Sequence, residues 1–319
     1  MAMPTLEHLY ELDPLDGRIA VQLASAYLET GQEERALELL EYCRKQPNME
    51  QTHLIEPMRL SVLYQMGRKD KANELFNQTI QIQEGRRVLL MQWSQILQKD
   101  KRWQTLFDML QDTSGKYPDL IPIIAERILQ LYLQENQDIQ SRALNLLADM
   151  EVRFPDQVPV LLALGRLYHA SGNIEQAVKY YKETLSLNPD QPIAINNLSW
   201  ILCTEMNECR QALQMANHGL EINPDHLDLL DTRGEIYYSL GIYEQAAEDL
   251  KKAVCLYEAN SPEKTKSCYR LVRSLSKLGD KEQMQNYLQM ALDLNKTSRA
   301  LSSEEEQELD RLLKESASL

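Results

Sequence analysis

Large apolar residues recur every three or four positions through most of the chain, and two such series alternate with short polar turns. The stretch from residue 158 to residue 189 shows the pattern most clearly. Its first series contains Leu161 and Leu164, and its second contains Tyr181 and Leu185. A period of three to four residues is typical of amphipathic α-helices. The stretch is therefore predicted to form two helices joined by a turn.

Small and turn-forming residues stand where this pair of helices requires them. Gly172 follows the first apolar series, at the position where a helix commonly ends in a left-handed residue. Gly165 and Ala177 have little or no side chain, so the two helix axes can approach closely there. Pro189 cannot continue a helix and separates this unit from the next one. Because one such hairpin cannot bury its own apolar face, we expect several of them to stack.

The same arrangement recurs along the chain with a nearly constant period. Units begin near residues 17, 53, 87, 122, 158, 192, 227 and 265, so successive starts are 34 to 38 residues apart. In the unit at residue 158, Leu164-Gly165, Tyr168, Ala177 and Pro189 follow the order L-G-x2-Y…A…P. This order and period resemble the tetratricopeptide repeat. The resemblance implies an all-α fold, a right-handed α-solenoid of about eight helix-turn-helix repeats with a C-terminal capping helix.

The resemblance divides the chain into three parts. Residues 1–16 are expected to be the remnant second helix of a truncated upstream repeat, because Leu6 matches an apolar position of such a helix. Residues 17–298 would hold the eight repeats. Residues 299–319 are expected to form a capping helix and tail, since Ser302 and the acidic residues after it suit the first turn of a helix. The inner face of that helix would contain Leu309, Leu312 and Leu313.

The composition narrows the choice of partners. The 319 residues include 34 Lys and Arg but 48 Asp and Glu, which gives a net charge of −14. Proteins that bind nucleic acid usually carry a basic face, so we expect no nucleic-acid partner. No apolar run is long enough to span a bilayer, so we expect no membrane insertion. The chain is expected to be cytoplasmic, although a fragment of a longer protein would leave signal or anchor segments out.

No motif predicts catalysis or a cofactor. The chain has no Gly-rich phosphate loop, no H-E-x-x-H and no G-x-S-x-G. Its five histidines are spread over different repeats and its five cysteines form no CxxC pair, so we expect no catalytic residue, no bound metal and no cofactor. Cys203 and Cys209 are close enough in sequence to pair, but we expect both to be small buried residues. The chain is therefore predicted not to be an enzyme.

In such a superhelix the first helix of each repeat lines the inner wall. Asn196 and Asn197 are the most informative wall residues, because an amide both donates and accepts hydrogen bonds, as a peptide group does. In the family, an inner-wall Asn at the position of Asn197 often bonds the backbone of an extended peptide. Trp200, one turn further, offers a flat apolar contact; alternatively, these residues only begin the core of their helix. The expected peptide-binding residues are Leu162, Arg166, His169, Asn196, Asn197, Trp200, Asp231, Glu235, Tyr238, Tyr269, Arg270 and Arg273.

The charges along this wall alternate in sign. Arg166 is positive, Asp231 and Glu235 are negative, and Arg270 and Arg273 are positive again. They could attract a partner with the complementary pattern, or they could pair with one another between neighbouring repeats. The sequence leaves both interpretations open.

One subtype of the family clamps the carboxylate tail of chaperones with Lys, Asn and Arg from three successive repeats. Lys266 and Arg270 match its third repeat. The repeat before it would need Asn but has Thr232, and the repeat before that would need Lys and Asn but has Asn196 and Trp200. Half of the clamp is absent, so the sequence does not predict a co-chaperone.

These observations predict a non-enzymatic protein–protein interaction scaffold that binds an extended peptide or helix of a partner in its concave groove. Two alternatives remain. One is an adaptor or assembly segment of a larger multi-domain enzyme or envelope complex. The other is a self-association module built on the degenerate third and fourth repeats, where Trp93 and Trp103 would be exposed unless both belong to the core.

Overall fold

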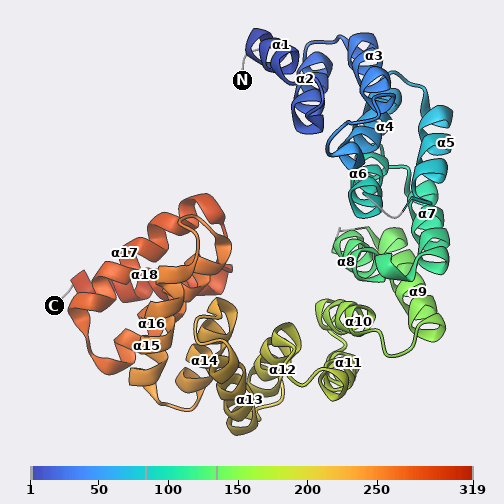
Figure 1. The fold of residues 1–319 in the computed structure, drawn as a ribbon. Coiled ribbons are helices and arrows are strands. Elements are labelled where there is room, and N and C mark those ends of the chain that lie inside the picture. Colours follow the sequence, from blue (N-terminus) through green and yellow to red (C-terminus); the bar gives the residue numbers. More distant parts are fainter. Residues whose placement is uncertain (1–2, 83–84, 134–135, 318–319) are drawn as a thin grey trace. The chain divides into compact units, whose positions relative to one another are not determined.

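The computed structural model describes residues 3–82, 85–133 and 136–317, and every regular element in these ranges is a helix (Figure 1). The all-α repeat fold is therefore confirmed. The chain separates into two compact units, residues 1–146 and residues 147–319, with the division inside helix α9. Each unit is described by itself.

The first unit consists of short helices that pack on their neighbours in the chain, α2 on α3, α3 on α4 and α4 on α5. Its elements are α1 (Met3–Leu12), α2 (Gly17–Glu29), α3 (Glu33–Arg44), η1 (Thr52–Leu54), α4 (Ile55–Gln65), α5 (Lys69–Thr79), α6 (Arg86–Lys99), α7 (Trp103–Lys116), η2 (Pro118–Leu120), α8 (Ile121–Tyr132) and the first part of α9 (Gln137–Arg153).

Trp93 belongs to the core of this unit. Its side chain is 1% exposed, its ring meets Tyr64 edge-on at 5.3 Å between centroids, and it stacks on Phe76 at 6.4 Å. The interpretation of Trp93 as an exposed residue for self-association is therefore wrong. Trp103, at the start of α7, is half-buried.

The second unit repeats one arrangement four times: a helix, a short turn and a second helix that packs on the first. After the end of α9 its elements are α10 (Val158–Ala170), α11 (Ile174–Leu187), α12 (Pro192–Thr204), α13 (Cys209–Ile222), α14 (Leu227–Ser239), α15 (Tyr243–Leu256), α16 (Pro262–Leu278), α17 (Lys281–Ser298) and α18 (Ser303–Ala317).

Two glycines set the close approach of paired helices in this unit. A Cβ atom on Gly165 of α10 would lie 2.8 Å from the Tyr181 ring of α11, and one on Gly234 of α14 would lie 2.6 Å from Leu250 of α15. Both distances are too short for a real contact, so only glycine allows these large side chains to reach the facing helix. Tyr181 and Leu250 are each fully buried there.

Helices begin close to the residues expected from the repeat period. The α-helices at the eight expected starts begin at residues 17, 55, 86, 121, 158, 192, 227 and 262. The largest difference, three residues, is at α16, because the Ser261 side chain accepts from the Lys264 amide and caps the helix early, and Pro262 suits its first turn. The division of residues 17–298 into eight repeats stays our interpretation of this order.

The last helix, α18, begins with a reciprocal cap. The Glu305 amide donates to the Ser302 hydroxyl at 3.3 Å, and the Ser302 amide donates to the Glu305 carboxylate at 2.8 Å. Leu309 and Leu312 are buried against the cluster that contains residues of α16 and α17. Leu313, which we expected on the same inner face, is 41% exposed, because its position on the helix lies beyond the edge of the buried stripe.

Cys203 and Cys209 form a disulfide bond, so the expectation that they are merely small buried residues was wrong in part. Both are buried, at 5% and 8% exposed. The turn between α12 and α13 brings the end of one helix to the start of the next, a proximity that the spacing allowed but did not establish. The other three cysteines are free; Cys43 and Cys268 are buried and Cys255 is exposed.

Candidate functional site

The first helices of three successive helix pairs enclose a pocket in the second unit. Helices α12 and α14 pack on one another, as do α14 and α16, and the space between their side chains has a volume of about 210 Å³. Nine of its ten lining residues carry a polar or charged group, but the apolar parts of these side chains make up most of the lining surface. The lining residues are Asn196, Asn197, Trp200, Asp228, Asp231, Thr232, Tyr257, Glu263, Lys266 and Arg270.

A chain of amide hydrogen bonds forms one wall of the pocket. Asn196 donates through Nδ2 to Oδ1 of Asn197 at 3.3 Å, and Asn197 donates through Nδ2 to the Tyr181 hydroxyl oxygen at 3.1 Å. Burial raises the pKa of the Tyr181 hydroxyl to about 12, so it is a neutral phenol that can accept this bond. The bonds fix the orientation of the Asn197 amide, and Asn197 itself is half-buried.

Trp200 lies next to this pair on α12 and is half-buried. The guanidinium carbon of Arg270, from α16, lies over the indole ring at 4.7 Å from its centroid. A guanidinium at this distance from an aromatic face is attracted by the ring quadrupole. The contact joins the first helices of two repeats that are not neighbours in sequence.

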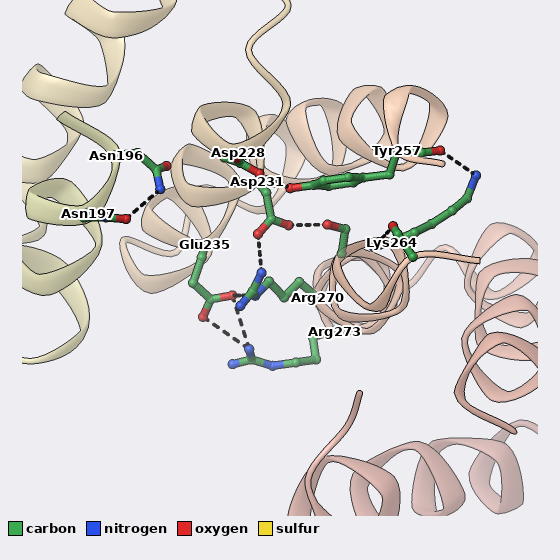
Figure 2. A network of polar contacts seen from close by, with 11 residues as sticks. Asn196, Asn197, Asp228, Asp231, Glu235, Tyr257, Lys264, Arg270 and Arg273 are labelled. Atoms are coloured by element: carbon green, nitrogen blue, oxygen red, sulfur yellow. Dashed lines mark hydrogen bonds and ion pairs between the residues drawn. The ribbon is translucent and has the colours of Figure 1, made fainter. Parts of the chain in front are cut away.

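Ion pairs between α14 and α16 lie at the edge of the pocket, where Asp231 and Arg270 belong to its lining and Glu235 and Arg273 continue the pairing outside it. Figure 2 shows the guanidinium groups of Arg270 and Arg273 reaching toward the carboxylates of Asp231 and Glu235. Arg270 pairs with Asp231 and approaches Glu235 at 3.6 Å, and Arg273 pairs with Glu235 at 3.2 Å. Four of these charges therefore pair between neighbouring repeats, as one of the two interpretations of the sequence expected.

Asp231 is the most deeply buried of these charged groups. Its side chain is 11% exposed, and it accepts a second hydrogen bond from the Ser267 hydroxyl at 2.5 Å. Burial raises the pKa of the Asp231 carboxyl above its usual range, and the nearby carboxylate of Glu235 adds to this; Arg270 and Ser267 act in the opposite direction. The ionised form of Asp231 therefore depends on the positive charge of Arg270.

The mouth of the pocket carries charges that the sequence analysis did not select as binding residues. Asp228 accepts a hydrogen bond of 2.8 Å from the Tyr257 hydroxyl, and Glu263 and Lys266 are exposed. Asp228 and Lys266 are at helical spacing from two expected residues, since Asp228 is three residues before Asp231 and Lys266 is four before Arg270. Tyr257 gave no such signal, because it lies after the end of α15, in a connection.

Like Glu235 and Arg273, the remaining expected residues lie outside the pocket lining. Tyr238 stacks on the Arg273 guanidinium at 4.1 Å, next to the ion pairs. Tyr269 is 7% exposed and donates to Glu308 of α18 at 2.6 Å, so the last helix covers it. Leu162, Arg166 and His169 are all half-buried on α10, and burial lowers the pKa of the His169 imidazole.

Among the residues with described side chains, no group of three or more His, Cys, Asp or Glu is arranged to hold a metal ion. None of the helices in the described ranges is both long and apolar enough to cross a membrane. The lining of the pocket offers amides, an indole, hydroxyls, carboxylates and two basic groups.

Two segments of the chain match sequence profiles of a known family. Residues 141–201 and residues 265–298 each match a profile described as tetratricopeptide repeat. The chain therefore contains tetratricopeptide repeats in these two segments. The first matched segment contains most of α9, all of α10 and α11 and most of α12, and the second contains α17 and most of α16. Both segments contribute residues to the pocket.

The curated relatives align with about half of this chain. It is 26% identical over 177 residues to the cellulose synthase operon protein C of Pseudomonas fluorescens, covering 52% of this chain and 14% of the relative. It is 22% identical over 149 residues to the peroxisomal targeting signal receptor of Candida albicans, covering 46% of this chain and 25% of the relative. The alignments thus span a quarter or less of the length of these two relatives.

Among solved structures, the crystal structure of PilW, described as a widely conserved type IV pilus biogenesis factor, is similar with a TM-score of 0.50. The similarity covers 60% of this chain and 86% of the PilW chain, at 16% sequence identity. At this identity the likeness shows the fold alone.

Proposed function

We propose that this tetratricopeptide repeat protein is a non-enzymatic scaffold that binds an extended segment of a partner protein at the pocket between α12, α14 and α16. The observation that carries the proposal is the lining of that pocket: two amides, an indole and opposite charges from the first helices of three successive pairs. The family assignment adds that such helices belong to interaction repeats.

The lining suits a peptide better than a small apolar ligand. Small-molecule pockets are lined mainly by hydrophobic and aromatic side chains with few polar groups. Here nine of the ten lining residues carry an amide, a hydroxyl or a charge, and the tenth is Trp200. The Asn196 and Asn197 amides can exchange their present bonds for the N–H and C=O groups of an extended backbone. Trp200 supplies apolar area at low entropic cost.

The names of two relatives point to two uses of such a surface. One relative is named a receptor for a peroxisomal targeting signal, and this favours recognition of a short peptide by the present chain as well. The other is named for a cellulose synthase operon, and this favours the alternative that the chain is an assembly segment of a larger complex. Both uses need the same pocket to hold a partner segment.

Truncation of Trp200 or Asn197 is expected to weaken binding of a linear peptide selected on the wild-type protein from a phage-displayed library. We expect Trp200→Ala to raise the dissociation constant roughly thirtyfold, as loss of a central aromatic contact does. Asn197→Ala should raise it roughly fivefold, the value of one or two hydrogen bonds. Fluorescence anisotropy of the labelled peptide measures both constants.

The matched control is Asn188→Ala, which removes an exposed amide in the connection between α11 and α12, outside the pocket. It should leave the dissociation constant unchanged. Circular dichroism of each variant excludes unfolding as the cause of a loss. If the selected peptide binds the Trp200 and Asn197 variants as tightly as wild type, the pocket is not the binding site.

A further inference from the structure

The turn between α12 and α13 is built differently from the turns of the other helix pairs in the second unit. In those turns a glycine takes the left-handed conformation, and the next amide donates to a carbonyl five residues back. Asn173 donates to the Tyr168 carbonyl and Ile242 to the Tyr237 carbonyl, both at 2.9 Å. Positive φ angles between 73° and 77° mark the glycines of these turns, Gly172, Gly241 and Gly279.

The α12–α13 turn has no glycine. Asn207 takes the left-handed conformation at φ 58°, at a cost that glycine does not have. The closing hydrogen bond also spans one residue more, from the Glu208 amide to the Leu202 carbonyl. Here the disulfide between Cys203 and Cys209 joins the two helices covalently. The disulfide is thus found in the turn that lacks the left-handed glycine of the other helix pairs.

The disulfide lies close to the binding residues along the same helix. Trp200 is three residues before Cys203 on α12, and its carbonyl accepts a hydrogen bond from Thr204 in the last turn of that helix. Both cysteines are part of the apolar cluster that includes Leu198, the neighbour of Asn197. A change in the order of the end of α12 therefore reaches Trp200 first.

We propose that the Cys203–Cys209 bond is a redox-sensitive tie that holds the end of α12, and with it Trp200, in the binding arrangement. A dithiol reductant breaks the S–S bond by two-electron exchange: the protein gains two thiols and the dithiol becomes a disulfide. The turn is then closed only by its hydrogen bonds, with Asn207 in place of the glycine of the other turns. The last turn of α12 frays, and Trp200 loses its fixed position beside Arg270. The effect on binding rests on the function proposed above.

Hydrogen exchange followed by mass spectrometry tests the tie without any partner. We expect amides in residues 198–210 of the air-oxidised protein to exchange faster after treatment with dithiothreitol, while those of α10 and α16 do not change. The double variant Cys203→Ser and Cys209→Ser should exchange fast in both conditions. Cys255→Ser, which removes the exposed free cysteine, should respond to dithiothreitol as wild type does.

Three outcomes overturn the proposal. The first is that Cys203 and Cys209 can both be alkylated in the air-oxidised native protein, because this would show that they are free thiols and not a disulfide. The second is that dithiothreitol does not reduce the bond under native conditions. The third is that the amides of residues 198–210 exchange at the same rate before and after reduction.

The phage-selected peptide then separates this proposal from the proposed function. If the tie controls the pocket, reduction weakens peptide binding about fivefold, which is a typical coupling between two sites. This weakening is expected in wild type and in Cys255→Ser, but not in the Cys203→Ser, Cys209→Ser double variant. If Trp200→Ala weakens binding but reduction does not, the pocket stands as the binding site and its redox control is wrong. If reduction changes exchange while Trp200→Ala leaves binding intact, the tie exists but the pocket is not the binding site.

Discussion

Replacing Leu250 with alanine is expected to lower the free energy of unfolding by about 2–5 kcal/mol, the range for buried Leu to Ala changes. Leu250 is fully buried on α15 and fills the space opposite Gly234 on α14. Its neighbours in the same cluster include Val254 and Leu271, so the cavity would be shared between two helix pairs and could not collapse easily. Urea unfolding followed by circular dichroism measures the change.

Two further variants separate a loss of packing from a general weakening of α15. Leu256→Ala removes a side chain of the same type on the same helix that is 44% exposed, and it should change stability by no more than about 0.5 kcal/mol. A Gly234→Ala change would place a methyl group in the space that Leu250→Ala empties, so the double variant should be more stable than the sum of the single changes. Equal effects for the Leu250 and Leu256 variants would show that Leu250 is not part of the core.

Much of the fold could be predicted because the information is local. The apolar period of three to four residues depends only on contacts within one repeat. The same holds for Gly172 at a turn and for Gly165 opposite the Tyr181 ring. Repetition of the same unit then sets the positions of the other helices. The exceptions are positions where several residues compete for one face, such as Leu313, whose exposure depends on how the last helix is rotated on its neighbours.

The candidate site was predictable only in part, because its geometry depends on contacts between repeats. Asn196, Asn197 and Trp200 were found since they follow one another along a single helix. That Arg270 would neutralise Asp231 and also cover Trp200 required knowing how far α16 lies from α12 and α14. For the same reason neither the Cys203–Cys209 bond nor the position of Tyr257 followed from the sequence.

The pairing of Asp231 with Arg270 leads to the second large effect. Replacing Arg270 with methionine keeps most of the apolar stem but leaves the buried carboxylate without its counter-charge. Breaking one partner of a buried pair costs about 3–5 kcal/mol, and we expect a loss of this size for Arg270→Met at pH 7. Glu235 keeps its pairing with Arg273, so the loss is centred on Asp231. Urea unfolding at pH 7 measures it.

The pH dependence of this variant tests the cause. A carboxyl whose pKa is raised in the folded chain binds its proton more tightly in the folded than in the unfolded state. Its protonation therefore favours folding at pH values between the ordinary aspartate pKa of about 3.9 and the raised pKa. This contribution to stability is lost as the pH rises through the raised pKa. Burial already raises the pKa of Asp231, and loss of Arg270 should raise it further. The stability difference between Arg270→Met and wild type should therefore shrink as the pH is lowered from 7 to 5.

The double variant Asp231→Asn with Arg270→Met isolates the buried charge. It shares the lost contact with Trp200 but has no carboxylate at residue 231, so it should regain most of the stability and show no such narrowing between pH 7 and pH 5. Arg311→Met serves as the matched control, because Arg311 pairs with Glu315 on α18 where both side chains are more than 60% exposed, and exposed pairs contribute at most about 1 kcal/mol. A loss for Arg270→Met no larger than that for Arg311→Met, or one that stays constant from pH 7 to pH 5, would mean that the Asp231–Arg270 pair is solvated and does not stabilise the packing of α14 on α16.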